Sequence, residues 1–203
     1  MKAIILSLFL AVAGFASAFE GIIHCVKTEN GVTTSFDFYV KGNQIAVIGS
    51  DGIGEYRILL DRGAGQMKLC IDHPQYDKKG YYLYSEGDEI KNRQLTILKK
   101  VQTDAIEIDG QLCKGYTVVT NEGTAIAYFG TDQVDLSGFS TYFNDPVYEL
   151  LDAMNSSTMP RKLVVNKGGN SYTIDMVAEA ATVDASYFEV PAGFEKFEVT
   201  TTE

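Results

Sequence analysis

Basic residues are scarce in this sequence. It contains 17 Lys and Arg against 27 Asp and Glu, which gives a formal net charge of −10 at pH 7. A chain this acidic repels phosphate backbones, and no cluster of Lys or Arg reverses the charge locally. The composition therefore argues against nucleic acid and against an anionic membrane surface as partners, and we expect the acidity to serve solubility.

Histidine is scarcer still, with two residues in the chain. His24 stands in an alternating stretch, where its neighbour Cys25 would point to the opposite face of a strand, so a metal site there would need further ligands. The sequence also lacks the G-x-S-x-G, H-E-x-x-H, P-loop and G-x-G-x-x-G patterns. We expect no metal, no cofactor and no catalytic residue. A hydrolase built on scattered carboxylates would lack the usual constellation of groups, so we expect a protein that is not an enzyme.

Cysteine is also rare, and its three residues, Cys25, Cys70 and Cys113, form no C-x-x-C motif. In an oxidising compartment three cysteines allow one disulfide and one free thiol, in three pairings. Cys70–Cys113 is the preferred pair, and it would stabilise the fold by about 4 kcal/mol on the chain-entropy model. The alternative is that all three are small buried hydrophobic residues.

One long apolar run is present, and it lies at the start of the chain. Lys2 precedes an apolar stretch over residues 3–15, and the small residues Ala16-Ser17-Ala18 follow it. This order predicts a signal peptide over residues 1–18, and the run is too short for a membrane anchor, which needs about 20 apolar residues. Phe19 would begin the mature protein, where a lipoprotein would carry Cys. We expect a single domain over residues 19–203 that is exported to the periplasm or the exterior, soluble, without a transmembrane span and not a lipoprotein.

From Phe19 onward, short alternating segments are separated by turn residues. Residues 34–41 alternate strictly, with Phe36, Phe38 and Val40 on one face. Asn30-Gly31 before them is a strong hairpin signal, because both central residues of a type I′ turn need positive φ. The pattern predicts an antiparallel meander with strands over residues 34–41, 44–49, 55–60, 66–71, 81–84, 95–101, 105–108, 112–120, 124–129, 162–165 and 171–178.

One helix is expected within this β chain. Asp145 can cap it and Pro146 suits its first turn. Apolar residues then recur at helical spacing, namely Val147, Leu150, Leu151 and Met154. A helix this short is marginal alone, so its apolar stripe must rest on the sheet. A shorter helical turn is expected over residues 184–188.

Four segments occur in an order typical of one family: Phe19-Glu20-Gly21, YVKGNQI (39–45), IDGQLCKGYTV (108–118) and YFEVPAGFEKF (187–197). On these the chain resembles the bacterial envelope proteins catalogued as domain of unknown function 4412, which are grouped with the LolA-like half-barrels. The resemblance implies a mainly β fold: a single curved antiparallel sheet of ten or eleven strands, with one short helix packed on its concave side. The family has no established activity, so the resemblance implies no catalytic residue.

The closing segment of the chain has a structural interpretation. Pro191 cannot donate to a strand ladder, and Gly193 permits the turn that follows. We expect a latch in which four side chains return to the sheet: Phe188, Val190, Phe194 and Phe197.

If the sheet curves as the resemblance implies, its concave face can hold an apolar ligand or a lipidated partner, such as a lipid or a lipoprotein. The residues expected to line that face are Phe36, Phe38, Val40, Leu112, Tyr116, Val118 and Leu151. The alternative is an interaction protein whose core is filled by its own side chains and which binds no small molecule.

Overall fold

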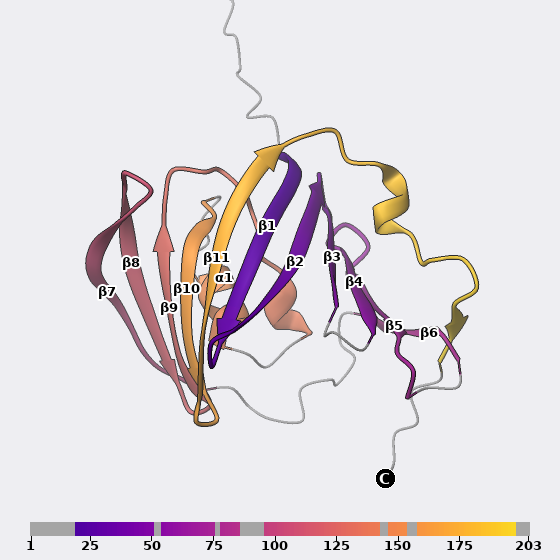
Figure 1. The fold of residues 1–203 in the computed structure, drawn as a ribbon, viewed down its shortest axis with the longest axis horizontal. Helices are drawn as coiled ribbons and strands as arrows, with labels where there is room; N and C mark the ends of the chain where they lie inside the picture. The colour runs from indigo at the N-terminus through magenta and orange to yellow at the C-terminus, as the bar shows by residue number, and fades with distance from the viewer. Residues whose placement is uncertain are drawn as a thin grey trace, which may run out of the picture.

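A computed structural model describes residues 19–50, 54–75, 78–85, 96–142, 146–153 and 158–197 of the chain. Twelve strands in these ranges form one open sheet, drawn in Figure 1. The strands are β1 (Glu20–Glu29), β2 (Val32–Lys41), β3 (Gln44–Ser50), β4 (Glu55–Asp61), β5 (Gln66–Asp72), β6 (Gly80–Ser85), β7 (Ile97–Ile108), β8 (Gln111–Thr120), β9 (Gly123–Phe129), β10 (Pro160–Lys167), β11 (Asn170–Ala180) and β12 (Glu195–Lys196). The helical segments are α1 (Pro146–Ala153) and the 3-10 turns η1 (Phe139–Thr141) and η2 (Ala185–Phe188).

The sheet consists of two meanders joined along one strand pair. Its order is β12-β6-β5-β4-β3-β2-β1-β11-β10-β9-β8-β7. Strands β1 to β6 follow one another along one half and β7 to β11 along the other, and the antiparallel pair β1–β11 connects the halves. The predicted antiparallel meander is confirmed. The strand count is slightly higher than predicted: β1 and the short strand β12, which runs parallel to β6, were not among the eleven predicted strands, and two of those eleven form the single strand β7.

Turn chemistry sets the register of the first hairpin. Asn30 and Gly31 have φ angles of 51° and 78°, as a type I′ turn requires. Glu29 therefore lies opposite Val32, and the pairing continues to Glu20 opposite Lys41. The hairpin predicted from Asn-Gly is confirmed.

Strand β7 differs from the prediction of two strands over 95–101 and 105–108. It is continuous from Ile97 to Ile108, with irregular register between Thr103 and Ile106. A β-bulge adds residues to one strand without ending it, so the break in alternation that suggests two strands marks a bulge.

The main core lies between α1 and the middle strands, and Figure 1 shows α1 behind them. Val147, Leu150 and Leu151 form one buried face of α1, as predicted, whereas Asp145 and Met154 lie outside the described residues. Phe139 of η1 is fully buried and meets the Phe38 ring edge-on, with centroids 6.2 Å apart. We call α1, η1 and the segment 134–142 that leads to the helix the plug. It lies on the concave side, as the resemblance implies.

A smaller core cluster lies on the opposite, convex face. Ala46, Leu59 and Cys70 are buried there, with Phe188, Val190 and Phe194 of the closing segment packed on them. Gly193 has a φ of 83°, which permits the turn before Phe194. Phe197, beyond the edge strand β12, packs instead on the concave side against Tyr82 of β6, with ring centroids 5.2 Å apart. The predicted latch is confirmed.

The expected Cys70–Cys113 disulfide is absent from the structure, in which all three cysteines are free and buried. Cys70 lies on β5, third from one end of the sheet, and Cys113 on β8, second from the other end. All three cysteines are buried in separate places, which agrees with the alternative that they act as small hydrophobic residues.

Candidate functional site

Six of the seven residues expected to line a ligand site lie together in the structure. Phe38, Val40, Val118 and Leu151 belong to the main core, and the partly buried Phe36 and Tyr116 pack against it. The side chains that cover them come from the plug and its surroundings, and Phe139, Leu150 and Met159 are fully buried. This part of the concave face is therefore occupied by the protein itself.

Leu112 is the exception, because it is 71% exposed and lies outside the core. Strand β8 pairs with β9 only from Lys114 onward, opposite Phe129. Leu112 therefore stands on the part of the β7–β8 hairpin that extends beyond β9. Alternation alone placed it on the same face as Tyr116 and Val118, but it did not show where the neighbouring strand ends.

The concave face continues over β4, β5 and β6. Gly49 of β3 pairs with Phe36 on β2 and with Tyr56 on β4. Residues that pair directly across neighbouring strands lie on the same face of the sheet, so Phe36 and Tyr56 share one face. Continuing this register across β5 and β6 gives a set of concave side chains that are partly exposed. We call it the β4–β6 surface; its members are Tyr56, Ile58, Leu69, Ile71, Tyr82 and Tyr84.

Aromatic contacts organise the β4–β6 surface. The rings of Tyr82 and Tyr84 lie with centroids 6.2 Å apart at an interplanar angle of 27°. Tyr56 lies across Gly49, where a Cβ atom would stand 2.5 Å from the Tyr56 Oη. Burial, together with the nearby Tyr82, raises the pKa of Tyr84. The surface is thus apolar, with tyrosine hydroxyls at intervals.

The sequence did not indicate the β4–β6 surface. Strands β4 and β5 alternate, but Leu59 and Cys70 add buried apolar residues on the convex face that the latch covers, so the pattern does not say which face is the concave one. Leu59 and Leu60 illustrate this, since both are buried, on opposite faces. Only the strand register identifies which residues face the concave side.

An arginine holds the plug against this half of the sheet. Arg62 donates from Nη1 to Asp135 Oδ2 over 2.6 Å and from Nη2 to the Gly42 carbonyl oxygen over 3.0 Å. Burial raises the pKa of Asp135, but hydrogen bonds from Ser137 and the Arg62 guanidinium outweigh burial, so that pKa lies below its usual value. The backbone N–H of Gly138 donates to Asp152 over 2.7 Å, which ties the plug segment to α1.

Among the residues that the structure describes, no group of three or more His, Cys, Asp or Glu side chains could hold a metal ion. Within the same ranges, no helix is both long and apolar enough to cross a membrane.

The chain matches no family model and no curated protein. Among solved structures it is similar to PNGF-II in its C2 crystal form, at 13% identity and a TM-score of 0.51, over 88% of this chain and 31% of that one. It also matches MucB, at 9% identity and a TM-score of 0.44 over 88% and 58% of the two chains. LprF from Mycobacterium bovis matches at 9% identity and a TM-score of 0.38 over 81% and 88%.

This chain thus spans about a third of the PNGF-II chain that it matches. At 13% identity the likeness shows the fold alone. The half-barrel that the sequence resemblance implies is the architecture observed, whereas the specific family, domain of unknown function 4412, stays a prediction.

Proposed function

We propose that the protein is an exported, non-enzymatic envelope protein that binds an acyl chain, of a lipid or a lipidated partner, on the β4–β6 surface. One observation carries the proposal. The concave face is filled by the plug over its middle strands, but Tyr56, Ile58, Leu69, Ile71, Tyr82 and Tyr84 remain partly exposed beside it. Concave surfaces that combine apolar side chains with a few polar groups are the usual sites of small ligands.

The expected affinity follows from the area that such a surface offers. Burying about 200 Å² of acyl chain at about 25 cal/mol per Å² gives a gross gain of about 5 kcal/mol. Association costs remove a large share of this gain, so binding no tighter than micromolar is expected.

The second candidate is an interaction protein with a self-filled core. The observation that favours it is the burial of Phe38, Val40 and Val118 beneath the plug, whose own Leu151 is buried against them. In that case the β4–β6 surface would contact a protein partner and would bind no free lipid.

Two variants with the same substitution on opposite faces of the sheet test the proposal. Ile58 on β4 faces the concave side, whereas Ile48 on the neighbouring strand β3 faces the convex side, and both are partly buried. Ile58→Asp should weaken the binding of a fluorescent long-chain alcohol, a probe that carries no carboxylate, at least tenfold, and Ile48→Asp should leave its affinity unchanged. Thermal unfolding of both variants would confirm that they are folded.

A monomeric wild-type protein that does not bind the probe would overturn the acyl-chain proposal and leave the interaction protein. Equal losses in the two variants would also count against it, because they would place the probe elsewhere than on the β4–β6 surface.

A further inference from the structure

A cavity of about 500 Å³ lies between the end of β7 and the strands β10 and β11. Because β8 pairs with β9 only from Lys114 onward, the tip of the β7–β8 hairpin extends beyond β9. The irregular register between Thr103 and Ile106 lies where this tip begins. The lining residues are Ile106, Glu107, Ile108 and Asp109 from the tip and Arg161, Lys162, Asp175, Met176 and Val177 from β10 and β11.

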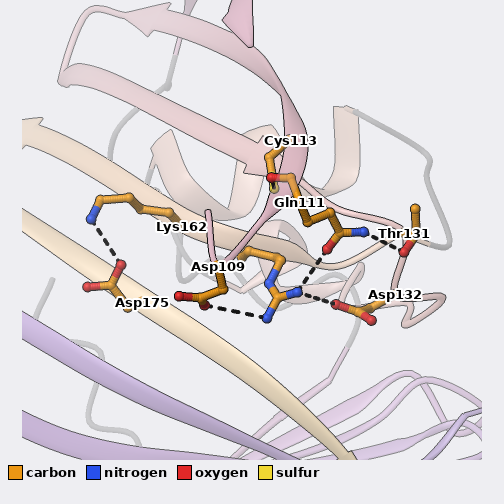
Figure 2. A network of polar contacts seen from close by, with 8 residues as sticks. Asp109, Gln111, Cys113, Thr131, Asp132, Lys162 and Asp175 are labelled. Carbon is orange, nitrogen blue, oxygen red and sulfur yellow. Dashed lines mark hydrogen bonds and ion pairs between the residues drawn. The ribbon is translucent and has the colours of Figure 1, made fainter. Parts of the chain in front are cut away.

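Arg161 is the least exposed charged residue that lines this cavity, with 19% of its side chain exposed. Its Nη1 donates to Gln111 Oε1 over 2.8 Å. Two carboxylates stand further off, Asp109 at 3.8 Å from Nη2 and Asp132 at 4.0 Å from Nη1. Figure 2 shows Asp109, Gln111 and Asp132 around the guanidinium.

The hydrogen-bonding capacity of Arg161 is largely unused. A guanidinium has five N–H donors, and the Nε of Arg161 is buried with no partner among the described residues. Buried donors are normally paired, and a charged group left without hydrogen bonds is costly. The two carboxylates compensate the charge at a distance, but they do not fill the Nε and Nη2 edge of the guanidinium.

The surroundings hold Arg161 in a fixed position. Its stem packs over Gly130, where a Cβ atom would lie 2.9 Å from the Arg161 Cδ, so a larger residue would displace it. Gln111, which accepts from Nη1, is itself oriented by a hydrogen bond to Thr131 Oγ1 of 2.6 Å. Arg161 is therefore already held in position, so a ligand can bind it with little loss of side-chain freedom.

We propose that this cavity binds a monocarboxylate with an apolar body. The ligand carboxylate would take the Nε and Nη2 edge of Arg161, in the bidentate geometry that arginine offers to carboxylates. The apolar body would lie against Ile106, Ile108 and Val177, the last of which is 51% exposed.

Asp109 Oδ2, 3.8 Å from Nη2, lies beside the edge that the ligand carboxylate would take. Its side chain is 76% exposed and stands on a turn, with a φ of 50°, so it can rotate into solvent and leave the Nη2 side of Arg161 to a ligand. Replacing it with a ligand carboxylate exchanges one negative charge for another. A multivalent anion such as phosphate fits less well, because Glu107, Asp132 and Asp175 already surround the site with negative charge.

Three probes separate the two parts of the ligand in a titration followed by NMR of the cavity residues. Octanoate carries both the carboxylate and the apolar body, acetate carries the carboxylate alone, and octanol lacks the charge. We expect octanoate to bind at least tenfold more tightly than either of the others, because only it uses both Arg161 and the apolar wall.

The variant Asp109→Asn distinguishes a ligand site from a structural ion pair. Asn tolerates the positive φ of this turn position as Asp does, so the fold should be kept. If Asp109 competes with the ligand for Arg161, its neutralisation should tighten octanoate binding at least threefold. A purely structural pairing of Asp109 with Arg161 predicts no tightening.

Further variants locate the site. Arg161→Gln should abolish octanoate binding. Val177→Asp should weaken it about tenfold, because the new carboxylate repels the ligand, whereas Val32→Asp, on an exposed residue at the far end of the β1–β2 hairpin, should leave it unchanged. The proposal would be overturned if octanoate shifted the cavity resonances in neither wild type nor Asp109→Asn. It would also be overturned if octanol bound as tightly as octanoate.

This site is independent of the β4–β6 surface, from which it differs in all its residues. Ile58→Asp should therefore leave the effect of Asp109→Asn on octanoate binding intact. Loss of that effect in Ile58→Asp would place the octanoate on the β4–β6 surface and overturn the carboxylate site.

Discussion

The ring of Tyr39, on β2, stacks on the ring of Tyr187, in η2, with centroids 3.9 Å apart and an interplanar angle of 11°. The pair joins the second strand of the chain to its closing segment. Asp184 caps η2 by accepting from the Ser186 backbone N–H over 2.8 Å, which holds Tyr187 in position. The latch therefore begins with a defined contact, before Phe188 and Phe194 reach the convex face.

Loosening this contact should change the ionisation of Tyr39. Burial, followed by the charge of Asp37 and contact with Tyr187, raises the pKa of Tyr39 to about 12. Tyr187→Ala should lower that pKa toward about 10, the ordinary value, because it exposes the Tyr39 ring to water. An NMR titration of ring-labelled tyrosine would measure the change. Tyr187→Phe keeps the stacked ring and should retain most of the shift; equal pKa values for Tyr39 in Tyr187→Ala and wild type would contradict the prediction.

A second prediction concerns the end of the latch. Gly80 of β6 leaves space for the Phe197 ring, and any Cβ atom at position 80 would overlap it. Gly80→Ala should therefore lower the free energy of unfolding by about 1–3 kcal/mol, the usual cost of overpacking. In Phe197→Ala the ring is gone, so the same glycine substitution should cost much less. Urea unfolding of the four proteins of this double-mutant cycle measures the coupling, and additive losses would show that Gly80 and Phe197 do not interact.

The latch and the ligand surface show what the sequence can and cannot predict. The latch was predictable because Pro191 and Gly193 specify a strand end and a turn locally, and both act through their own backbone. The hairpins and α1 were predictable for the same reason. Each is specified by residues within a few positions of one another.

The candidate site was only partly predictable, because it depends on which strands lie beside which. Phe38 and Val118 share a face in the sequence pattern and meet in the core, but the pattern does not say that the plug covers them. Tyr56 and Tyr82 were missed because alternation does not show which face of their strands is concave or how far the plug covers it. The Arg161 cavity depends on a bulge in β7 and on where β9 ends, and neither leaves a periodic signal.

A third prediction concerns pH. His24 on β1 forms a hydrogen bond of 2.9 Å with Asp37 and lies 3.5 Å from Glu179. The hydrogen bond to Asp37, with the charges of both carboxylates, outweighs partial burial and raises the pKa of His24. Because the pKa of His24 is higher in the folded than in the unfolded protein, protonated His24 stabilises the fold. This stabilisation is fully present below about pH 6.5, the unfolded-state pKa, and is lost as the pH rises through the folded-state pKa.

This contribution should be small, since the His24 side chain is 48% exposed and solvent screens the pair. In Asp37→Asn the loss of stability between about pH 5.5 and 8.5 should therefore be slightly smaller than in wild type. Urea unfolding at the two pH values measures this difference, and an NMR titration of His24 should show its pKa falling in the variant. An unchanged His24 pKa in Asp37→Asn would contradict the assignment of the shift to this carboxylate.

The last prediction concerns the thiols. All three cysteines are free, and burial raises the pKa of Cys70 to about 11 and that of Cys25 further still. Because the thiolate is the reactive form, native protein should label slowly at neutral pH, and three thiols per chain should react on unfolding without a reductant. A count of one thiol in the unfolded, unreduced protein would instead indicate a disulfide. A cross-linked peptide containing Cys70 and Cys113 would confirm that disulfide directly. Such a bond would require the two ends of the sheet to lie closer together than they do in the structure.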